Sequence, residues 1–317
     1  MVKRKIAILL LLCFCLCFLP WNVRAVSTED AVEPIRPGEL CTLTVSYCCD
    51  GIAFADVPVK LYKIANVTAD FYYSLTEAFA GTELILNGIQ TAGEWNVVRY
   101  TLEAWILAQN IPAERTATTD ANGQVCFENL ETGMYLAVVG EVNQGALWYY
   151  FDSALVALPG LGTDGFWQYQ VAVNAKAEWL PPIEPDEEIS LKVLKLWKGD
   201  EGRNDRPESV EIQIYRNGVI HETVTLSEEN HWAYSWTAKN DGASWVVVEQ
   251  NVPAGYRMTV EARERSFVVT NTRTTDEPPV PPPATGDTFN LLVPIVLMSI
   301  SGSMLILLGG IGKRNER

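Results

Sequence analysis

Short runs of alternating apolar and polar residues fill the second half of the chain, and turn residues separate them. Side chains at alternate positions of a strand point to opposite faces of a sheet, so each run predicts a strand with one buried face. Strands this closely spaced favour an all-β sandwich over residues 189–274. The runs are SLKVLKLW, SVEIQIYRNG, HETVTL, WAYSWT, SWVVVEQ, RMTVEA and SFVVTNT.

Residues 26–179 carry a similar series of runs, which a helical repeat interrupts once. Between Glu94 and Asn110 apolar side chains recur at helical spacing and form one stripe. We therefore expect two Ig-like β-sandwich domains in tandem, with one helix inserted in the first. The strand runs are CTLTVSY, VPVKLYKI, GQVCFENL, GMYLAVV, WYYFDSALVALP and WQYQVAV, and the stripe is Trp95, Val98, Leu102, Trp105 and Ile106.

The two blocks meet at EWLPPIEPDEE, where prolines and acidic residues break the strand pattern. We place a linker at residues 180–188. This division leaves an N-terminal domain at residues 26–179 and a second domain at residues 189–274, each long enough to build its own core.

The N-terminus has the order of a secretory signal peptide. Basic residues precede the apolar stretch Ile6–Pro20, and Val23-Arg24-Ala25 offers small residues at the −3 and −1 positions of a cleavage site. Residues 1–25 are therefore expected to be removed before Val26. An uncleaved membrane anchor is the alternative.

A second apolar run lies near the C-terminus. Residues 291–311 are long enough for a transmembrane helix, and the basic tail at 312–317 predicts a cytoplasmic end. Residues 275–290 contain a proline-rich stretch, which disfavours both a helix and a sheet interior and predicts a semi-rigid extended spacer. The precursor is thus expected to be a single-pass membrane protein with its two domains outside the cell.

Composition excludes several classes of function. Residues 26–312 hold 17 Lys and Arg against 38 Asp and Glu, a formal charge of −21, so nucleic acid is not expected as a partner. The sequence has neither a Gly-rich phosphate loop nor a His-Glu-x-x-His motif, and His221 and His231 are its only histidines. We expect no enzyme, no cofactor and no metal.

Three of the seven cysteines leave with the signal peptide. The mature chain keeps Cys41, Cys48, Cys49 and Cys126, which allow three pairings that sequence does not rank. A free-thiol state is equally open.

Three polar residues occupy positions that the strand pattern reserves for the core of the second domain. By alternation, Lys195 shares a face with Leu191 and Val193, and Glu249 and Asn271 fall on the apolar faces of the fifth and last strands. Buried charges and amides are costly unless they meet one another. Strand ends open to solvent are the alternative.

The residues of this domain resemble the Cna protein B-type domain of Gram-positive surface proteins. The order KVLKLW, RPESVEIQIYRNG, NHWAYSWT, WVVVEQNVPAGY and FVVTNT is similar over nearly all of residues 189–273. The resemblance implies an intramolecular isopeptide bond between Lys195 and Asn271, formed with loss of ammonia and assisted by Glu249. A hydrogen-bonded triad without a crosslink is the alternative.

The first domain resembles the prealbumin-like superfamily of pilin domains through TTDANGQVCFENLETGMYLAVV. Its inward positions are Tyr47, Val139 and Val173, so we expect an apolar core without a crosslink. The stretch WQYQVAVNAK, residues 167–176, is similar to the pilin motif Trp-x3-Val-x-Val-Tyr-Pro-Lys, with Asn-Ala in place of Tyr-Pro. In that family the lysine links subunits, which would make Lys176 the linking amine. A surface lysine at a strand end is the alternative.

The residues Pro282, Pro283, Ala284, Thr285 and Gly286 resemble the Leu-Pro-x-Thr-Gly sorting signal, with proline at the first position. In that family a sortase cleaves between Thr and Gly through a cysteine thioester and transfers the threonyl carbonyl to an amine. The resemblance implies that Thr285 becomes joined to cell-wall peptide or to another pilin subunit. A plain single-pass anchor with a proline-rich stalk is the alternative.

Together these patterns predict a cell-wall-anchored surface structural protein of a Gram-positive bacterium, a pilin or pilin-like stalk subunit. The expected partners are sortase and other subunits or wall peptide. The alternative is a monomeric adhesin whose N-terminal domain binds a host or glycan ligand.

Overall fold

The structure is a computed structural model, and it describes residues 33–274 except 141, 145–146, 181–186, 202–205 and 264. The signal peptide, the sorting motif at 282–286, the apolar run at 291–311 and the basic tail lie outside the described residues. Within the described part of the chain, no helix is long and apolar enough to cross a membrane.

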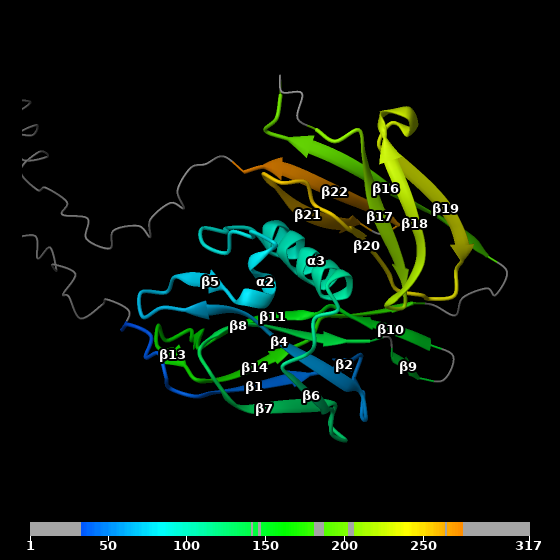
Figure 1. The fold of residues 1–317 in the computed structure, drawn as a ribbon. Coiled ribbons are helices and arrows are strands. Elements are labelled where there is room, and N and C mark those ends of the chain that lie inside the picture. The colour runs from blue at the N-terminus through cyan, green and yellow to red at the C-terminus, as the bar shows by residue number, and fades with distance from the viewer. Residues whose placement is uncertain are drawn as a thin grey trace, which may run out of the picture. The chain divides into compact units, whose positions relative to one another are not determined.

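The first domain is built from two main sheets, as its alternating runs predict. One sheet has the order β14-β1-β7 and the other β11-β8-β4-β5, with β6 paired to β4 (Figure 1). Apolar residues of both sheets form one cluster between them, so this domain is a sandwich. Its strands are β1 (Cys41–Ser46), β2 (Cys48–Cys49), β3 (Ile52–Ala53), β4 (Pro58–Val67), β5 (Tyr73–Leu75), β6 (Arg115–Thr118), β7 (Gln124–Leu130), β8 (Gly133–Val139), β9 (Val142–Gln144), β10 (Leu147–Phe151), β11 (Ala154–Leu158), β12 (Gly160–Leu161), β13 (Trp167–Gln168), β14 (Gln170–Asn174) and β15 (Ala177–Leu180).

The inserted helix is α3 (Ala92–Ala108), and a four-residue helix, α2 (Glu77–Ala80), precedes it without a counterpart in the sequence prediction. A capping box fixes the start of α3: Thr91 accepts a hydrogen bond from the backbone of Glu94, and the Glu94 carboxylate accepts one from the backbone of Thr91. The predicted apolar stripe packs into a second cluster of this domain.

The second domain follows the predicted strands closely. One sheet has the order β19-β16-β22-β21 and the other β18-β17-β20, and the apolar faces of both sheets enclose one cluster. The first and last strands, β16 and β22, are parallel neighbours (Figure 1). The elements are β16 (Glu188–Lys198), β17 (Ser209–Arg216), β18 (Val219–Ser227), the 3₁₀ turn η2 (Glu228–Asn230), β19 (Ala233–Lys239), β20 (Trp245–Glu249), β21 (Tyr256–Arg263) and β22 (Ser266–Arg273).

Helix α3 also contacts the second domain through its small residues. Ala104 is fully buried in the core cluster of that domain, and the Thr101 hydroxyl accepts a hydrogen bond of 2.9 Å from the backbone N–H of Val260 on β21. Since β21 is an edge strand, Thr101 satisfies a buried N–H that no strand partner takes.

All four cysteines of the expected mature chain are free thiols in the structure. Cys41 is buried, and burial raises the pKa of its thiol to about 11. Cys48 and Cys126 are exposed. Because all four thiols are free, none of the three possible pairings is formed.

Candidate functional site

The three core polar residues of the second domain come together from three strands. In the parallel β16–β22 pair Lys195 lies opposite Val269 and Trp197 opposite Asn271. Lys195 and Asn271 are therefore diagonal neighbours, and both are buried, as the alternation predicts. Glu249, the last residue of β20 in the facing sheet, reaches both of them.

The carboxylate of Glu249 bridges the amine and the amide. Its Oε2 lies 3.4 Å from Lys195 Nζ, and its Oε1 accepts a hydrogen bond of 3.0 Å from Asn271 Nδ2. The side chains of Lys195 and Glu249 have no exposed surface, and Asn271 is 0% exposed. An unmatched charge at this depth would be strongly destabilising, so the three groups depend on one another.

Burial moves both ionisable groups toward their neutral forms. Desolvation lowers the pKa of Lys195 to about 8, although the nearby Glu249 opposes this shift. Desolvation also raises the pKa of Glu249, against the opposing effect of Lys195. A neutral amine is a nucleophile and a neutral carboxyl is a proton donor, so burial favours the reactive form of each group.

Aromatic rings close the site against water. The Lys195 ammonium position lies 4.2 Å from the centroid of the Trp197 ring, and Trp197 packs edge-on against Trp232 and Tyr256. The sequence pattern indicates Trp197, because it shares the face of Lys195. It does not indicate Trp232, which precedes its strand with a positive φ of 56°.

A buried aspartate fixes one wall of this aromatic enclosure. Asp200 accepts hydrogen bonds from the Arg206 guanidinium and, at 3.0 Å, from the Tyr256 hydroxyl. The Arg206 hydrogen bond is the main cause that lowers the pKa of Asp200 to about 2. Asp200 lies in the loop after β16, where no strand pattern marks it, so sequence reasoning misses it.

Two buried oxygen atoms of the cluster, Glu249 Oε2 and Asn271 Oδ1, accept no hydrogen bond from the described residues. Glu249 Oε2 keeps its ion pair with Lys195 Nζ at 3.4 Å. Asn271 Oδ1 is therefore the atom of the cluster that departs from the usual pairing of buried polar groups.

The first domain has no comparable cluster at the corresponding inward positions. Tyr47 is 0% exposed and packs edge-on against Phe151 at 5.3 Å, and Val139 and Val173 pack against the same apolar cluster.

Lys176 lies apart from the buried triad, in the two-residue gap between β14 and β15 of the first domain. Its side chain is 69% exposed, and its Nζ lies 3.7 Å from a carboxylate oxygen of Asp152. Trp167 of the same motif is partly buried and stacks on Phe71, with ring centroids 5.0 Å apart.

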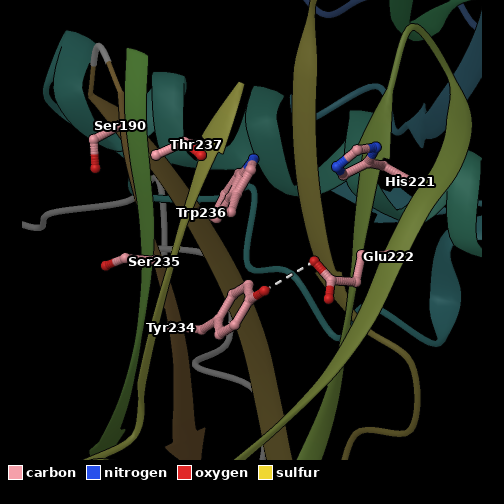
Figure 2. A pocket seen from close by; sticks show the side chains of 7 residues that line it. All are labelled: Ser190, His221, Glu222, Tyr234, Ser235, Trp236 and Thr237. Atoms are coloured by element: carbon pink, nitrogen blue, oxygen red, sulfur yellow. Dashed lines mark hydrogen bonds between the residues drawn. The ribbon is translucent and has the colours of Figure 1, made fainter. Parts of the chain in front are cut away.

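The two histidines are both exposed and lie at different elements. His231 caps the η2 turn with a positive φ of 54°. His221 borders a shallow pocket of about 440 Å³ between the edge strands β18 and β19. Figure 2 shows Tyr234 and Glu222 facing one another across this pocket, where the tyrosine hydroxyl donates a hydrogen bond of 3.0 Å.

Comparison with known proteins points to the second domain. The family model of the Cna protein B-type domain matches residues 191–272. The chain is 28% identical over 102 residues to the collagen adhesin of Staphylococcus aureus, which corresponds to 30% of this chain and 9% of that protein.

The solved structures that are similar to this chain include a B repeat unit and a pilin. A single B repeat unit of the collagen-binding surface protein of Staphylococcus aureus aligns with 75% of this chain and 99% of its own, at 16% identity and a TM-score of 0.26. The full-length major pilin SpaD from Corynebacterium diphtheriae aligns with 75% of this chain and 67% of its own, at 13% identity and a TM-score of 0.27.

Proposed function

We propose that this chain is a surface structural protein of a Gram-positive bacterium, a pilin or pilin-like stalk subunit whose second domain is closed by an isopeptide bond between Lys195 and Asn271. The observation that carries the proposal is the fully buried contact of Lys195, Glu249 and Asn271 across the first and last strands. The match of residues 191–272 to the Cna protein B-type domain supports it.

The crosslinking reaction needs one proton shuttle and no external reagent. The neutral Lys195 amine attacks the Asn271 side-chain carbonyl carbon, and a C–N bond forms while the carbonyl becomes tetrahedral. Protonated Glu249 donates to the amide and takes up a proton from the attacking nitrogen. The bond to Nδ2 then breaks, and one ammonia leaves.

For Glu249 to take this role the Asn271 amide has to turn, because its Nδ2 now faces the carboxylate. Turning the amide by half a rotation exchanges its oxygen and nitrogen, which brings Oδ1 to the position now held by Nδ2, 3.0 Å from the Glu249 carboxyl. A protonated Glu249 would then donate to the carbonyl oxygen that the reaction polarises, and Oδ1 would no longer lack a partner.

The place of the bond suits a protein under tension. Force on the domain enters at the start of β16 and leaves at the end of β22, and these parallel strands would be sheared past each other. A covalent link from Lys195 to Asn271 would carry the force from one strand directly to the other. Residues 196–270 would then lie outside the force path.

We propose that sortase joins the chain to the cell wall or to another subunit at Thr285. The support is the sequence order of Pro282–Gly286, an apolar run and a basic tail. We expect C-terminal peptides from wall digests to end at Thr285 in mass spectrometry. If most of the wall-released protein gave peptides that continue through Gly286, the proposal would be contradicted.

Polymerisation would use Lys176, which is accessible and lies at the end of the first domain. Replacing Lys176 with arginine keeps the charge but removes the nucleophile at neutral pH. We expect Lys176→Arg to abolish a detergent-resistant ladder of wall-released protein while surface display continues. An unchanged ladder would exclude this lysine, and a single band from the unaltered chain would favour the monomeric adhesin.

A further inference from the structure

We propose that Asp152 positions the Lys176 amine and accepts its proton during subunit linkage. This inference rests on the proposed role of Lys176, and it adds a second residue to that site. The observation behind it is that Asp152 holds Lys176 at two separate points, one on the backbone and one on the side chain.

The backbone contact fixes where Lys176 lies. The N–H of Asp152 donates a hydrogen bond of 2.9 Å to the Lys176 carbonyl, next to the antiparallel pair of Phe151 and Ala177. The two residues therefore keep a constant separation. At the side chains, Asp152 Oδ2 lies 3.7 Å from Lys176 Nζ.

A buried arginine holds the Asp152 carboxylate in place. Arg99 on α3 has a side chain that is 9% exposed, and its Nη2 lies 3.2 Å from Asp152 Oδ1. Its Nη1 lies 3.1 Å from Glu103, and its guanidinium lies 4.1 Å from the Tyr100 ring. With one carboxylate oxygen committed to Arg99, the other is directed to Lys176.

The charged groups around the lysine thus form a short chain from the helix to the surface. Arg99 and Glu103 lie on α3, Asp152 lies in the turn between β10 and β11, and Lys176 follows β14. The Asp152 side chain is 39% exposed and that of Glu103 is 17% exposed, so Asp152 is the more solvent-facing carboxylate of the group.

This combination distinguishes Lys176 from the other ion-paired lysines of the described residues. Lys195 is fully buried, and the side chain of Lys63 is 13% exposed beside Glu131. Lys176 alone among these three combines an accessible amine with an anchored carboxylate. A large enzyme carrying an acyl group could reach it.

The chemical step balances with the sortase thioester as the acyl donor. Lys176 reacts as its neutral amine, after its ammonium has lost one proton to water. Nζ then attacks the threonyl carbonyl carbon of a second chain, a C–N bond forms, and the C–S bond to the sortase cysteine breaks. The sulfur leaves with the electron pair. Asp152 Oδ2 takes the proton that Nζ sheds and passes it to water or to the departing thiolate.

The test replaces residues of the full chain in the producing bacterium and follows the rate of ladder formation by pulse-chase. Asp152→Asn keeps the backbone hydrogen bond and removes the proton acceptor. We expect ladder formation at neutral pH to slow by about 100-fold, the lower range for loss of a general base, and to recover as the medium is made alkaline. Asp152→Glu should recover part of the rate at neutral pH, and Glu131→Gln, beside Lys63, should change nothing.

The outcomes separate the two claims. A ladder that forms in Asp152→Asn within twofold of the unaltered rate, while Lys176→Arg abolishes it, overturns the role of Asp152 alone. A ladder that persists in Lys176→Arg overturns the role of Lys176 and that of Asp152 with it. Loss of the ladder in Asp152→Asn without alkaline recovery or rescue by glutamate would show a structural effect and would also overturn the inference.

Discussion

Replacing Glu249 with glutamine gives a sharp stability prediction, because it removes the proton donor while keeping the size of the side chain. Lys195 and Asn271 both remain, and glutamine can still accept a hydrogen bond from Asn271 Nδ2, which now lies 3.0 Å from Glu249. Direct packing therefore changes little. The loss should come from the isopeptide bond, together with the cost of leaving the buried Lys195 amine without its carboxylate partner.

The magnitude follows from the loop that the bond closes. Lys195 lies in the first strand of the domain and Asn271 in the last, so the crosslink restricts nearly the whole unfolded domain. By analogy with disulfide loops of this length, the bond contributes about 4–5 kcal/mol to the free energy of unfolding. A domain of this size loses about 4–8 °C in Tm per kcal/mol, so loss of the bond alone should lower Tm by roughly 16–40 °C.

Scanning calorimetry of residues 26–275 would measure this change, with the mass of each sample recorded beforehand. The span includes the first domain because α3 contributes to the core of the second. Glu211→Gln on β17 is a matched control, since that side chain is exposed, and its Tm should stay near the unaltered value. A Glu249→Gln protein that has lost ammonia and melts with the unaltered protein would refute the reasoning.

Three further predictions test other parts of the structure. Thr101→Val should lower the free energy of unfolding by about 1–3 kcal/mol, because the Val260 N–H would be buried without an acceptor. Urea unfolding would measure this change, with Thr118→Val at an exposed position as the control. Equal urea midpoints for Thr101→Val and the unaltered protein would contradict the contact. Asn271→Ala cannot crosslink, and its free energy of unfolding should rise as the pH is raised from about 8 to 10.5. These are the folded and ordinary pKa values of Lys195, and between them the unfolded chain binds one proton more than the folded chain. A urea midpoint that falls or stays level in this range would contradict the prediction. Asp200→Asn should leave Arg206 and Tyr256 without their ionised partner. It should lower the urea midpoint much more at pH 7 than near pH 2, where Asp200 is already half protonated; an equal loss at both pH values would point to packing instead.

The period-two pattern predicts the cluster in the second domain because a strand leaves few choices for a side chain. Once Leu191 and Val193 are assigned to the core, Lys195 must follow them inward. The same argument places Glu249 and Asn271. What alternation does not provide is the parallel register of β16 with β22, which makes Lys195 and Asn271 neighbours; the resemblance to a known domain supplies that expectation.

The hydrophobic pattern does not predict the exact helix start, the division of one strand run or the contacts of small helix residues, and each has a physical reason. The predicted helix begins at Glu94, but α3 begins at Ala92, because Thr91 forms a capping box ahead of the apolar stripe. The run WYYFDSALVALP divides into β10 and β11, since the chain leaves one sheet and enters another at Asp152. Small residues of α3 such as Ala104 give no hydrophobic signal, yet their size lets the second domain approach closely.

Asp200 and Asp152 are missed for a shared reason. Both lie outside the strands, where a carboxylate is unremarkable in sequence, and each pairs with an arginine that the hydrophobic pattern does not indicate. Only the folded arrangement identifies them.

The intact mass of residues 26–275 tests the central claim most directly. We expect a mass lower than that of the sequence by one ammonia, with a tryptic species that joins the peptide of Lys195 to that of Asn271. Lys195→Ala, Glu249→Ala and Asn271→Ala should each restore the full mass. An unaltered protein whose mass equals that of its sequence would contradict the crosslink.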